Sequence, residues 1–179
     1  MPTTLLAGGS GLIGTRLAEL LREQGYTVRL LSRSPRGEGQ FAWDPAAGTL
    51  DEAATQDIDY VINLAGAGIA DRRWTAARKR ELIDSRVQST RVLAEALKRS
   101  GQRPKAWVSA SAIGYYGNSG ERIMHETDAP VERSFMVECC EQWEQVVDEV
   151  AALGIRTVKL RIGVVLAKEG GALAEFVKP

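Results

Sequence analysis

The chain is poor in cysteine and histidine and carries no excess charge of either sign. Its two cysteines, Cys139 and Cys140, are adjacent and cannot readily bridge to each other, which suits a reducing compartment better than a disulfide scaffold. The 23 Lys and Arg side chains balance 23 Asp and Glu side chains, so no overall field attracts nucleic acid or an anionic membrane. No apolar run approaches the roughly 20 residues that span a bilayer. We therefore expect a cytoplasmic protein without nucleic-acid or membrane partners.

Two further features exclude other classes of site. The only histidine, His125, stands in a polar stretch, so we predict neither a histidine-based triad nor a metal site. The basic run Arg72–Arg80 lacks the repeated aromatic residues of a nucleic-acid surface, and we interpret it as the solvated start of a helix.

Strand-like and helix-like segments alternate along the chain. Short apolar runs predict strands over residues 3–7, 26–31, 59–64, 106–110 and 155–160, with a shorter one at 40–43. Apolar residues at helical spacing follow the first strand and recur over residues 75–99 and 134–153, where Ser134 can cap the helix. The alternation predicts an α/β fold, a doubly wound parallel sheet of the Rossmann type with helices on both faces.

A glycine-rich turn joins the first predicted strand to the first helix. It reads Gly8-Gly9-Ser10-Gly11-Leu12-Ile13-Gly14. In a dinucleotide-binding turn, Gly8 permits the tight bend, Gly11 lets backbone N–H groups approach a pyrophosphate, and Gly14 allows the helix to pack closely on the sheet. The helix N-terminus also favours phosphate. A tight turn without a ligand is the alternative, but the strand before it and the helix after it favour a cofactor site.

The residues after the second predicted strand bear on the choice between NAD and NADP. An NAD site typically has Asp or Glu there to hold the ribose 2′-hydroxyl. This sequence has Ser32-Arg33, with Arg36 close behind, and an arginine can bind a 2′-phosphate through charge-assisted hydrogen bonds. We therefore predict NADP, or NADPH in its reduced form, as the cofactor. A solvated loop cation is the alternative for Arg33.

We expect residues 1–179 to form one NADP-binding domain. The last apolar segment, Ala172–Val177, breaks off at Pro179, and no second lobe follows to close the crevice at the carboxyl ends of the strands. We therefore expect the chain to be the N-terminal part of a longer protein whose C-terminal substrate lobe is missing here.

Several segments, in order, resemble the extended short-chain dehydrogenase/reductase superfamily, which contains the sugar-nucleotide epimerases. They are GGSGLIG at 8–14, NLAG at 63–66, SRVQSTRVLAEAL at 85–97, VSASAIGYYG at 108–117 and KLRIGVV at 159–165. More narrowly, RRWTAARKRELIDSRV, SAIGYYG and the cysteine-containing helix ending in Trp143-Glu144 are similar to epimerase-family proteins of unassigned substrate, a subgroup sometimes labelled cell-division inhibitor-like.

The resemblance implies further cofactor contacts. Leu64 and Ala65 are expected to line the adenosine side of the groove, with Gly66 beside them. Arg86 stands where many members carry Asn, so it is expected to reach a phosphate or ribose oxygen, with Glu81 nearby on the same helix. A surface ion pair is the alternative for Arg86.

The resemblance also implies a catalytic serine and a Tyr-x-x-x-Lys pair, and the chain lacks that pair. When the family motif is aligned on Glu144, Met136 stands at the tyrosine position and Cys140 at the lysine position. Ser111 best matches the catalytic serine, and Tyr115 or Tyr116 is left to donate a proton. Ser111 and Tyr115 are therefore the candidate catalytic residues. The alternatives are that the serine satisfies backbone groups at a strand end and that the tyrosines pack a loop.

Functions of different classes fit this sequence. The leading hypothesis is an NADP-dependent oxidoreductase or epimerase-like enzyme that acts on a small carbonyl, alcohol or sugar-nucleotide substrate through an atypical active site. The alternative is a non-catalytic NADP-binding regulatory or scaffold protein, because the Tyr/Lys pair is missing. A third interpretation is a partner-interaction module, since the resemblance implies a homodimer formed through helices 75–99 and 134–153.

Overall fold

Short apolar runs form the strands of a mostly parallel sheet in the computed structural model, which describes residues 1–173. The strands are β1 (Thr3–Ala7), β2 (Thr27–Ser32), β3 (Gln40–Asp44), β4 (Thr49–Leu50), β5 (Tyr60–Asn63), β6 (Ala106–Ala112) and β7 (Thr157–Ile162). Their order across the sheet is β4-β3-β2-β1-β5-β6-β7, and only β3 and β4 pair antiparallel. A separate antiparallel pair consists of β8 (Leu166–Ala167) and β9 (Gly170–Gly171). The predicted Rossmann fold is confirmed.

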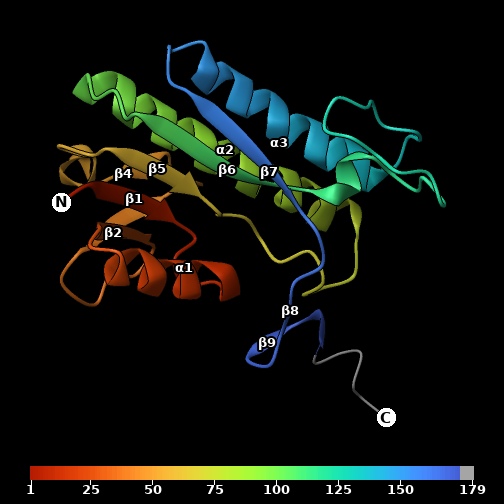
Figure 1. Ribbon diagram of the computed structural model, residues 1–179, viewed down its shortest axis with the longest axis horizontal. Coiled ribbons are helices and arrows are strands. Elements are labelled where there is room, and N and C mark those ends of the chain that lie inside the picture. The colour runs from red at the N-terminus through yellow and green to blue at the C-terminus, as the bar shows by residue number, and fades with distance from the viewer. Residues whose placement is uncertain (174–179) are drawn as a thin grey trace.

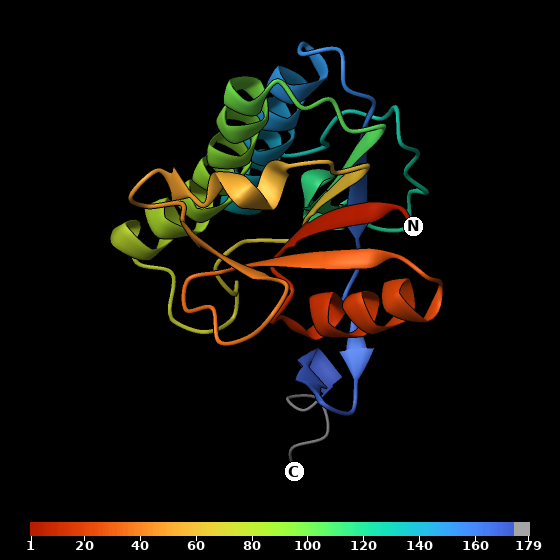
Figure 2. The same ribbon diagram turned by 90° about the vertical axis from the view of Figure 1, so that its left-hand side faces the viewer.

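Within residues 1–173, three helices cover the sheet, two on one face and one on the other (Figures 1 and 2). They are α1 (Leu12–Glu23), α2 (Ala76–Ser100) and α3 (Phe135–Ala151). The 3₁₀ turn η1 (Glu52–Thr55) lies between β4 and β5, and η2 (Ile113–Tyr115) lies between β6 and α3. Thr75 caps α2, and Ser134 caps α3 by accepting from the backbone N–H of Val137. Within residues 1–173, no helix is both long and apolar enough to cross a membrane.

The main core lies between the sheet and the pair α2 and α3. Trp107 on β6 is fully buried there, together with Leu93 of α2 and Val147 of α3. Val146 and Val150 of α3 are also buried within this chain, so the apolar stripe of the helix is used by its own core. The homodimer through these helices stays a prediction, and it would need their outer faces.

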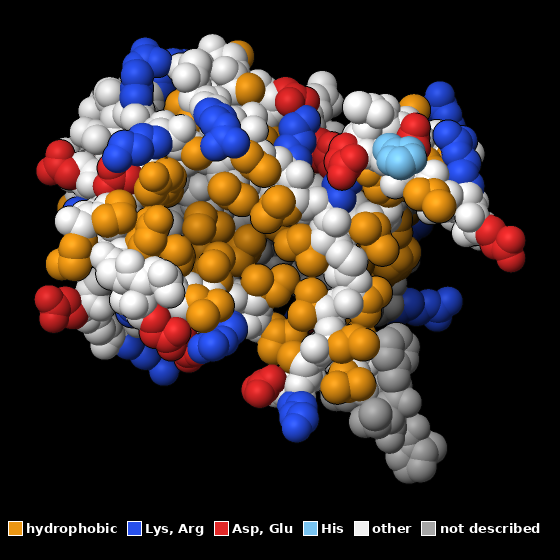
Figure 3. Space-filling model, viewed as in Figure 1, with side chains coloured by type: hydrophobic (Ala, Val, Ile, Leu, Met, Phe, Trp, Pro, Cys, Tyr) orange, Lys and Arg blue, Asp and Glu red, His pale blue; other side chains and the backbone are white. Residues whose placement is uncertain are grey.

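The other face of β5, β6 and β7 carries apolar side chains. Lys159 and Arg161 of β7 bond to α3, so the alternating residues Val158 and Leu160 point to the opposite side. Leu160 is 45% exposed, and no helix of residues 1–173 covers it. Figure 3, drawn from the same side as Figure 1, shows hydrophobic side chains gathered over the middle of the molecule.

Two boundaries differ from the sequence prediction. β7 begins at Thr157 and ends at Ile162, two residues later than predicted, because β6 continues to Ala112 and pairs with β7 in register up to that point. Between the strand predicted at 40–43 and the one predicted at 59–64, where no element was predicted, the structure has β4 and η1. Residues 174–177 of the predicted apolar segment lie outside the described residues. The shift of β7 places Arg161 inside a strand that faces α3.

Candidate functional site

The glycine turn packs α1 against the sheet with no room for side chains. Gly8 has φ +79°, and a Cβ built on it would lie 2.7 Å from the carbonyl carbon of Leu64. A Cβ on Gly14 would overlap the carbonyl oxygen of Gly8. The turn is closed by the N–H of Gly11, which donates to Gly8 O at 3.1 Å. The first N–H groups of α1 have no partner within the helix and are available to an anion.

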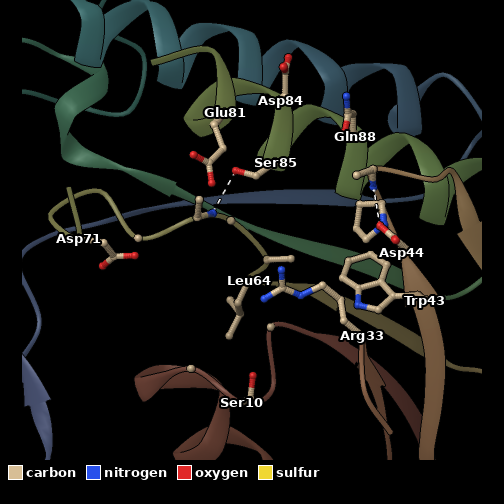
Figure 4. Close-up of a pocket in the computed structure, with 18 of the residues that line it drawn as sticks. Ser10, Arg33, Trp43, Asp44, Leu64, Asp71, Glu81, Asp84, Ser85 and Gln88 are labelled. Atoms are coloured by element: carbon tan, nitrogen blue, oxygen red, sulfur yellow. Dashed lines mark hydrogen bonds between the residues drawn. The ribbon is translucent and has the colours of Figure 1, made fainter. Parts of the chain in front are cut away.

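A cleft of about 1310 Å³ runs along the carboxyl ends of β1, β2, β3 and β5 (Figure 4). Of the predicted cofactor residues it is lined by Gly8, Ser10, Gly11, Ser32, Arg33, Leu64, Ala65, Gly66 and Glu81. The others, Leu12, Ile13, Gly14 and Arg86, are not among its lining residues. The strand order reverses at β1 and β5, which is where a doubly wound sheet binds its ligand.

Arg33 lies in this cleft as a free cation. Its side chain is exposed, and within residues 1–173 its guanidinium has no hydrogen bond or ion pair. Figure 4 shows it extending into the cleft between Leu64 and Trp43. The neighbouring Ser32 hydroxyl accepts from the backbone N–H of Ser34 at 3.1 Å. An anionic group in the cleft would therefore meet an uncompensated arginine at the end of β2.

Sequence reasoning missed part of the cleft wall, including Trp43 and Asp44 at the end of β3 and Gln88 on α2. The Asp44 carboxylate accepts from the backbone N–H groups of Ala46 and Ala47, at 2.9 and 3.3 Å, and so shapes the turn beside Trp43. The signal that could have found these residues is their position after a strand of the sheet, where side chains of neighbouring strands meet.

Arg78 was expected in a solvated helix start, and this expectation is wrong for that residue, which is only 7% exposed. Its guanidinium donates to Gly68 O at 2.6 Å and pairs with Glu81 at 2.8 Å, because the loop after β5 folds back over the start of α2. The hydrogen bond from Arg78 holds the pKa of Glu81 below its ordinary value. Ser85 accepts from the N–H of Ala67 at 3.0 Å in the same loop. These contacts fix the loop that forms one wall of the cleft.

Arg86 lies behind this loop, against Gly66. A Cβ on Gly66 would lie 3.2 Å from the guanidinium carbon of Arg86, so the missing side chain lets the arginine approach the cleft wall. The guanidinium stacks over the Trp143 ring at 4.9 Å and donates to Leu82 O at 2.8 Å. In the described part of the chain no carboxylate lies within 4.0 Å of it, so the alternative of a surface ion pair is not found. Burial lowers the pKa of Arg86.

At the carboxyl end of β6, Ser111 belongs to a buried network. Its hydroxyl donates to Glu144 Oε1 at 2.6 Å, and Arg161 donates to both oxygens of the same carboxylate at 2.8 Å. Burial opposes the ionisation of Glu144, but the hydrogen bonds from Arg161 and Ser111 outweigh it and hold its pKa below the ordinary value. Ser111 is 3% exposed and its proton is engaged.

The same arginine provides the cation that the sequence did not show beside the tyrosines. Arg161 Nη1 donates to Tyr116 Oη at 2.8 Å, and the guanidinium carbon lies 3.5 Å from the centre of the Tyr115 ring. Neither tyrosine lines the cleft described above. The catalytic roles of Ser111 and Tyr115 stay predictions, and the geometry adds Tyr116 as the tyrosine whose hydroxyl meets a cation.

Met136 and Cys140, at the positions of the missing pair, pack against η2. A Cβ on Gly114 would lie 3.1 Å from Met136 Cε and 3.8 Å from Cys140 Sγ. Burial raises the pKa of Cys140 to about 11. A thioether and a protonated thiol cannot replace a tyrosine and a lysine in proton transfer. Among residues 1–173, no group of three or more His, Cys, Asp or Glu side chains is placed to hold a metal ion.

The fold and the cleft together define a dinucleotide-binding Rossmann protein. The model of the NAD dependent epimerase/dehydratase family matches residues 4–167, and the chain belongs to this family. It is 38% identical over 172 residues to the epimerase family protein ML0860 of Mycobacterium leprae, which covers 96% of this chain and 55% of that protein. It is 35% identical over 177 residues to the human epimerase family protein SDR39U1, covering 98% and 58%.

Solved structures agree with this assignment. The crystal structure of human SDR39U1 with NADPH superposes with a TM-score of 0.82 at 34% identity, over 98% of this chain and 58% of that one. The nucleoside-diphosphate sugar epimerase of Corynebacterium glutamicum gives a TM-score of 0.84 at 30% identity, over 98% and 37%. The resemblance to extended short-chain dehydrogenases is confirmed, and the chain spans about half the length of the curated relatives it matches.

Proposed function

We propose that this chain binds NADPH and serves an oxidoreductase or epimerase reaction on a small carbonyl, alcohol or sugar-nucleotide substrate. The observation that carries the proposal is the free guanidinium of Arg33 in the cleft at the end of β2. An arginine there complements a 2′-phosphate, whereas the acidic residue of an NAD site would repel it. The NADPH named with the human relative supports the same choice.

The residues present fit such a cofactor. The cradle at Gly8, which a Cβ would fill, leaves the α1 N-terminus open to a pyrophosphate, and Ser10 and Gly11 line the cleft beside it. Leu64 and Gly66 form the wall after β5. When bound, the nicotinamide ring supplies or accepts a hydride at C4. The chain orients that ring and provides the groups that exchange protons with the substrate oxygen.

Tyr116 is the group best placed for proton exchange. Its hydroxyl oxygen accepts from Arg161, and within residues 1–173 its own proton has no acceptor, so the proton is available to a ligand. Ser111 and Tyr115 support it, the serine through Glu144 and Arg161 and the other tyrosine by stacking on Arg161. The guanidinium would stabilise the phenolate left after donation.

Titration calorimetry with NADPH and NADH tests the cofactor assignment. The wild-type protein should bind NADPH more tightly, and Arg33→Glu should weaken NADPH binding by on the order of tenfold or more while leaving NADH nearly unchanged. The matched control is Arg36→Glu, the same charge reversal at an exposed residue that does not line the cleft. Equal affinities for the two cofactors in the wild type, or equal losses in the two variants, would remove Arg33 from the site.

A non-catalytic regulatory or scaffold role is the second candidate, favoured by the engaged proton of Ser111 and by the packed Met136 and Cys140. A transfer assay with NADPH that carries deuterium at C4 distinguishes an enzyme from a regulatory or scaffold protein. An enzyme transfers the label to at least one member of a panel of carbonyl compounds that includes keto sugar nucleotides. Tight NADPH binding with no transfer to any of them, and intact cellular function in Ser111→Ala, would favour the regulatory role.

A further inference from the structure

Arg86 is a half-buried cation that the network around it leaves uncompensated. Its guanidinium donates once, to Leu82 O at 2.8 Å, and rests on the Trp143 ring at 4.9 Å. No carboxylate of residues 1–173 lies within 4.0 Å of it. The thiols of Cys139 and Cys140 are close by, but burial raises the pKa of both, so they stay neutral and do not balance the charge.

The sheet topology puts the loop in front of this cation beside the half of the site that would hold the nicotinamide. β2, with Arg33 at its end, and β5, with Gly66 after it, lie on opposite sides of β1. If the 2′-phosphate meets Arg33 and the pyrophosphate meets the glycine turn at the end of β1, the other half of the dinucleotide extends over the ends of β5 and β6. Gly66, which the family resemblance puts beside the adenosine contacts, follows β5 and so lies at the start of that region. Arg86 stands directly behind it, since a Cβ on Gly66 would lie 3.2 Å from the guanidinium carbon.

The oxidised nicotinamide ring carries a positive charge and the reduced ring is neutral. We infer that Arg86 makes this site favour NADPH over NADP⁺, an inference that rests on the proposed function. A fixed cation repels the oxidised ring and leaves the reduced ring unaffected. At an effective dielectric constant of about 20, repulsion between two unit charges several ångströms apart changes the ratio of the two affinities by on the order of tenfold.

The preference gives the proposed reaction a direction. A site that holds the reduced cofactor is loaded to reduce a carbonyl, whereas an enzyme that begins by oxidising an alcohol needs the oxidised cofactor in place. Arg86 therefore favours a carbonyl substrate over an alcohol or sugar-nucleotide alcohol as the first reactant. It also favours release of the cofactor after reduction of the substrate, because the ring then carries the charge that the guanidinium repels.

Calorimetric dissociation constants for NADP⁺ and NADPH test this on the purified protein. The wild type should bind NADPH more tightly, and Arg86→Gln should lower the ratio of the NADP⁺ to the NADPH dissociation constant by on the order of tenfold. Arg86→Lys, which keeps the charge, should retain most of the ratio. The control Arg91→Gln removes an exposed arginine of the same helix that pairs with Glu149 at 3.2 Å, and it should leave the ratio unchanged.

Wild-type protein alone provides a second measurement if Arg86→Gln fails to fold. The 2′-phosphorylated ADP-ribose fragment of the cofactor lacks the nicotinamide ring. NADP⁺ should bind no more tightly than this fragment, whereas NADPH should bind more tightly than the fragment. Equal affinities for NADP⁺ and NADPH in the wild type, or an unchanged ratio in folded Arg86→Gln, overturn the inference and leave the proposed function standing. Absence of binding by either cofactor overturns the proposed function and the inference with it.

Discussion

Arg161 on β7 and Glu144 on α3 form an ion pair with two hydrogen bonds, Nε to Oε1 and Nη2 to Oε2, each of 2.8 Å. The side chains are 16% and 7% exposed. Ser111 on β6 donates to the same carboxylate, and Tyr116 accepts from the same guanidinium. The pair therefore ties two strands, one helix and the loop after η2 together at the edge of the sheet where ligands bind.

Removing one member of this pair should cost much more stability than removing an exposed pair. Arg161→Met leaves the Glu144 carboxylate buried without its main partner, and we expect the free energy of unfolding to fall by about 3–5 kcal/mol in urea titrations. The control Arg91→Met breaks the pair with Glu149, whose members are 58% and 54% exposed, and should cost at most about 1 kcal/mol. Similar losses in both variants would contradict a buried, coupled pair.

The same pair predicts how stability depends on pH. The folded protein holds the pKa of Glu144 below its ordinary value of 4.5, so the unfolded chain binds the proton more readily. The stabilisation is complete above pH 4.5 and is lost as the pH falls through the lower folded value. Between pH 6 and pH 3, the free energy of unfolding of Glu144→Gln should therefore decline less than that of the wild type. A steeper decline in the variant would reverse the sign and reject this account.

Gly14 and Gly37 offer a matched test of the glycine turn. A Cβ at Gly14 would overlap Gly8 O, so Gly14→Ala should push α1 away from the sheet, lower the free energy of unfolding by about 1–3 kcal/mol and abolish the thermal shift with NADPH. Gly37 has open space around its Cβ position, and Gly37→Ala should keep both stability and cofactor binding. Retained NADPH binding in Gly14→Ala would mean that the turn tolerates a side chain.

The fold and much of the lining of the cleft could be predicted because local patterns encode them. A glycine turn between a strand and a helix carries a recognisable spacing, and ligands bind at the carboxyl ends of parallel strands, so Gly8, Arg33 and Leu64 were expected in the cleft that they line. The Glu144–Arg161 pair could not be predicted. It depends on the register of β7 against α3, and the two residues carry no motif that links them across the chain. Arg78 was misjudged for a similar reason, since its burial depends on a loop folding back over α2.

The two buried thiols should be unreactive in the folded protein. Burial raises the pKa of Cys140 to about 11, so at pH 8 roughly one thiol in a thousand is the reactive thiolate. Iodoacetamide should label both cysteines in urea within minutes, and native labelling should be slower by at least about a hundredfold. Rapid native labelling of Cys140, located by mass spectrometry, would show instead that the thiol at the position of the missing lysine is accessible and activated.

The last prediction concerns which tyrosine exchanges the proton. Tyr116 Oη meets Arg161 at 2.8 Å, whereas Tyr115 contacts the same guanidinium through its ring face, where loss of the hydroxyl changes little. Tyr116→Phe should therefore slow hydride transfer from NADPH to a carbonyl substrate by about 10²–10⁴-fold, and Tyr115→Phe by only a few-fold. NADPH affinity, measured by calorimetry, should stay unchanged in both, because neither tyrosine lines the cofactor cleft.

Arg161→Lys separates a chemical role of the arginine from a structural one. A lysine keeps the positive charge but loses the paired geometry toward Glu144, so reduction of the carbonyl should be slowed near neutral pH and partly recovered as the pH falls and solution acid supplies the proton. A purely structural arginine would instead change stability and leave the pH profile of transfer in the folded variant as it is in the wild type. If Tyr115→Phe slowed transfer more than Tyr116→Phe did, the assignment would be reversed. Tyr115, whose ring stacks on Arg161, would then be the residue that donates the proton to the substrate.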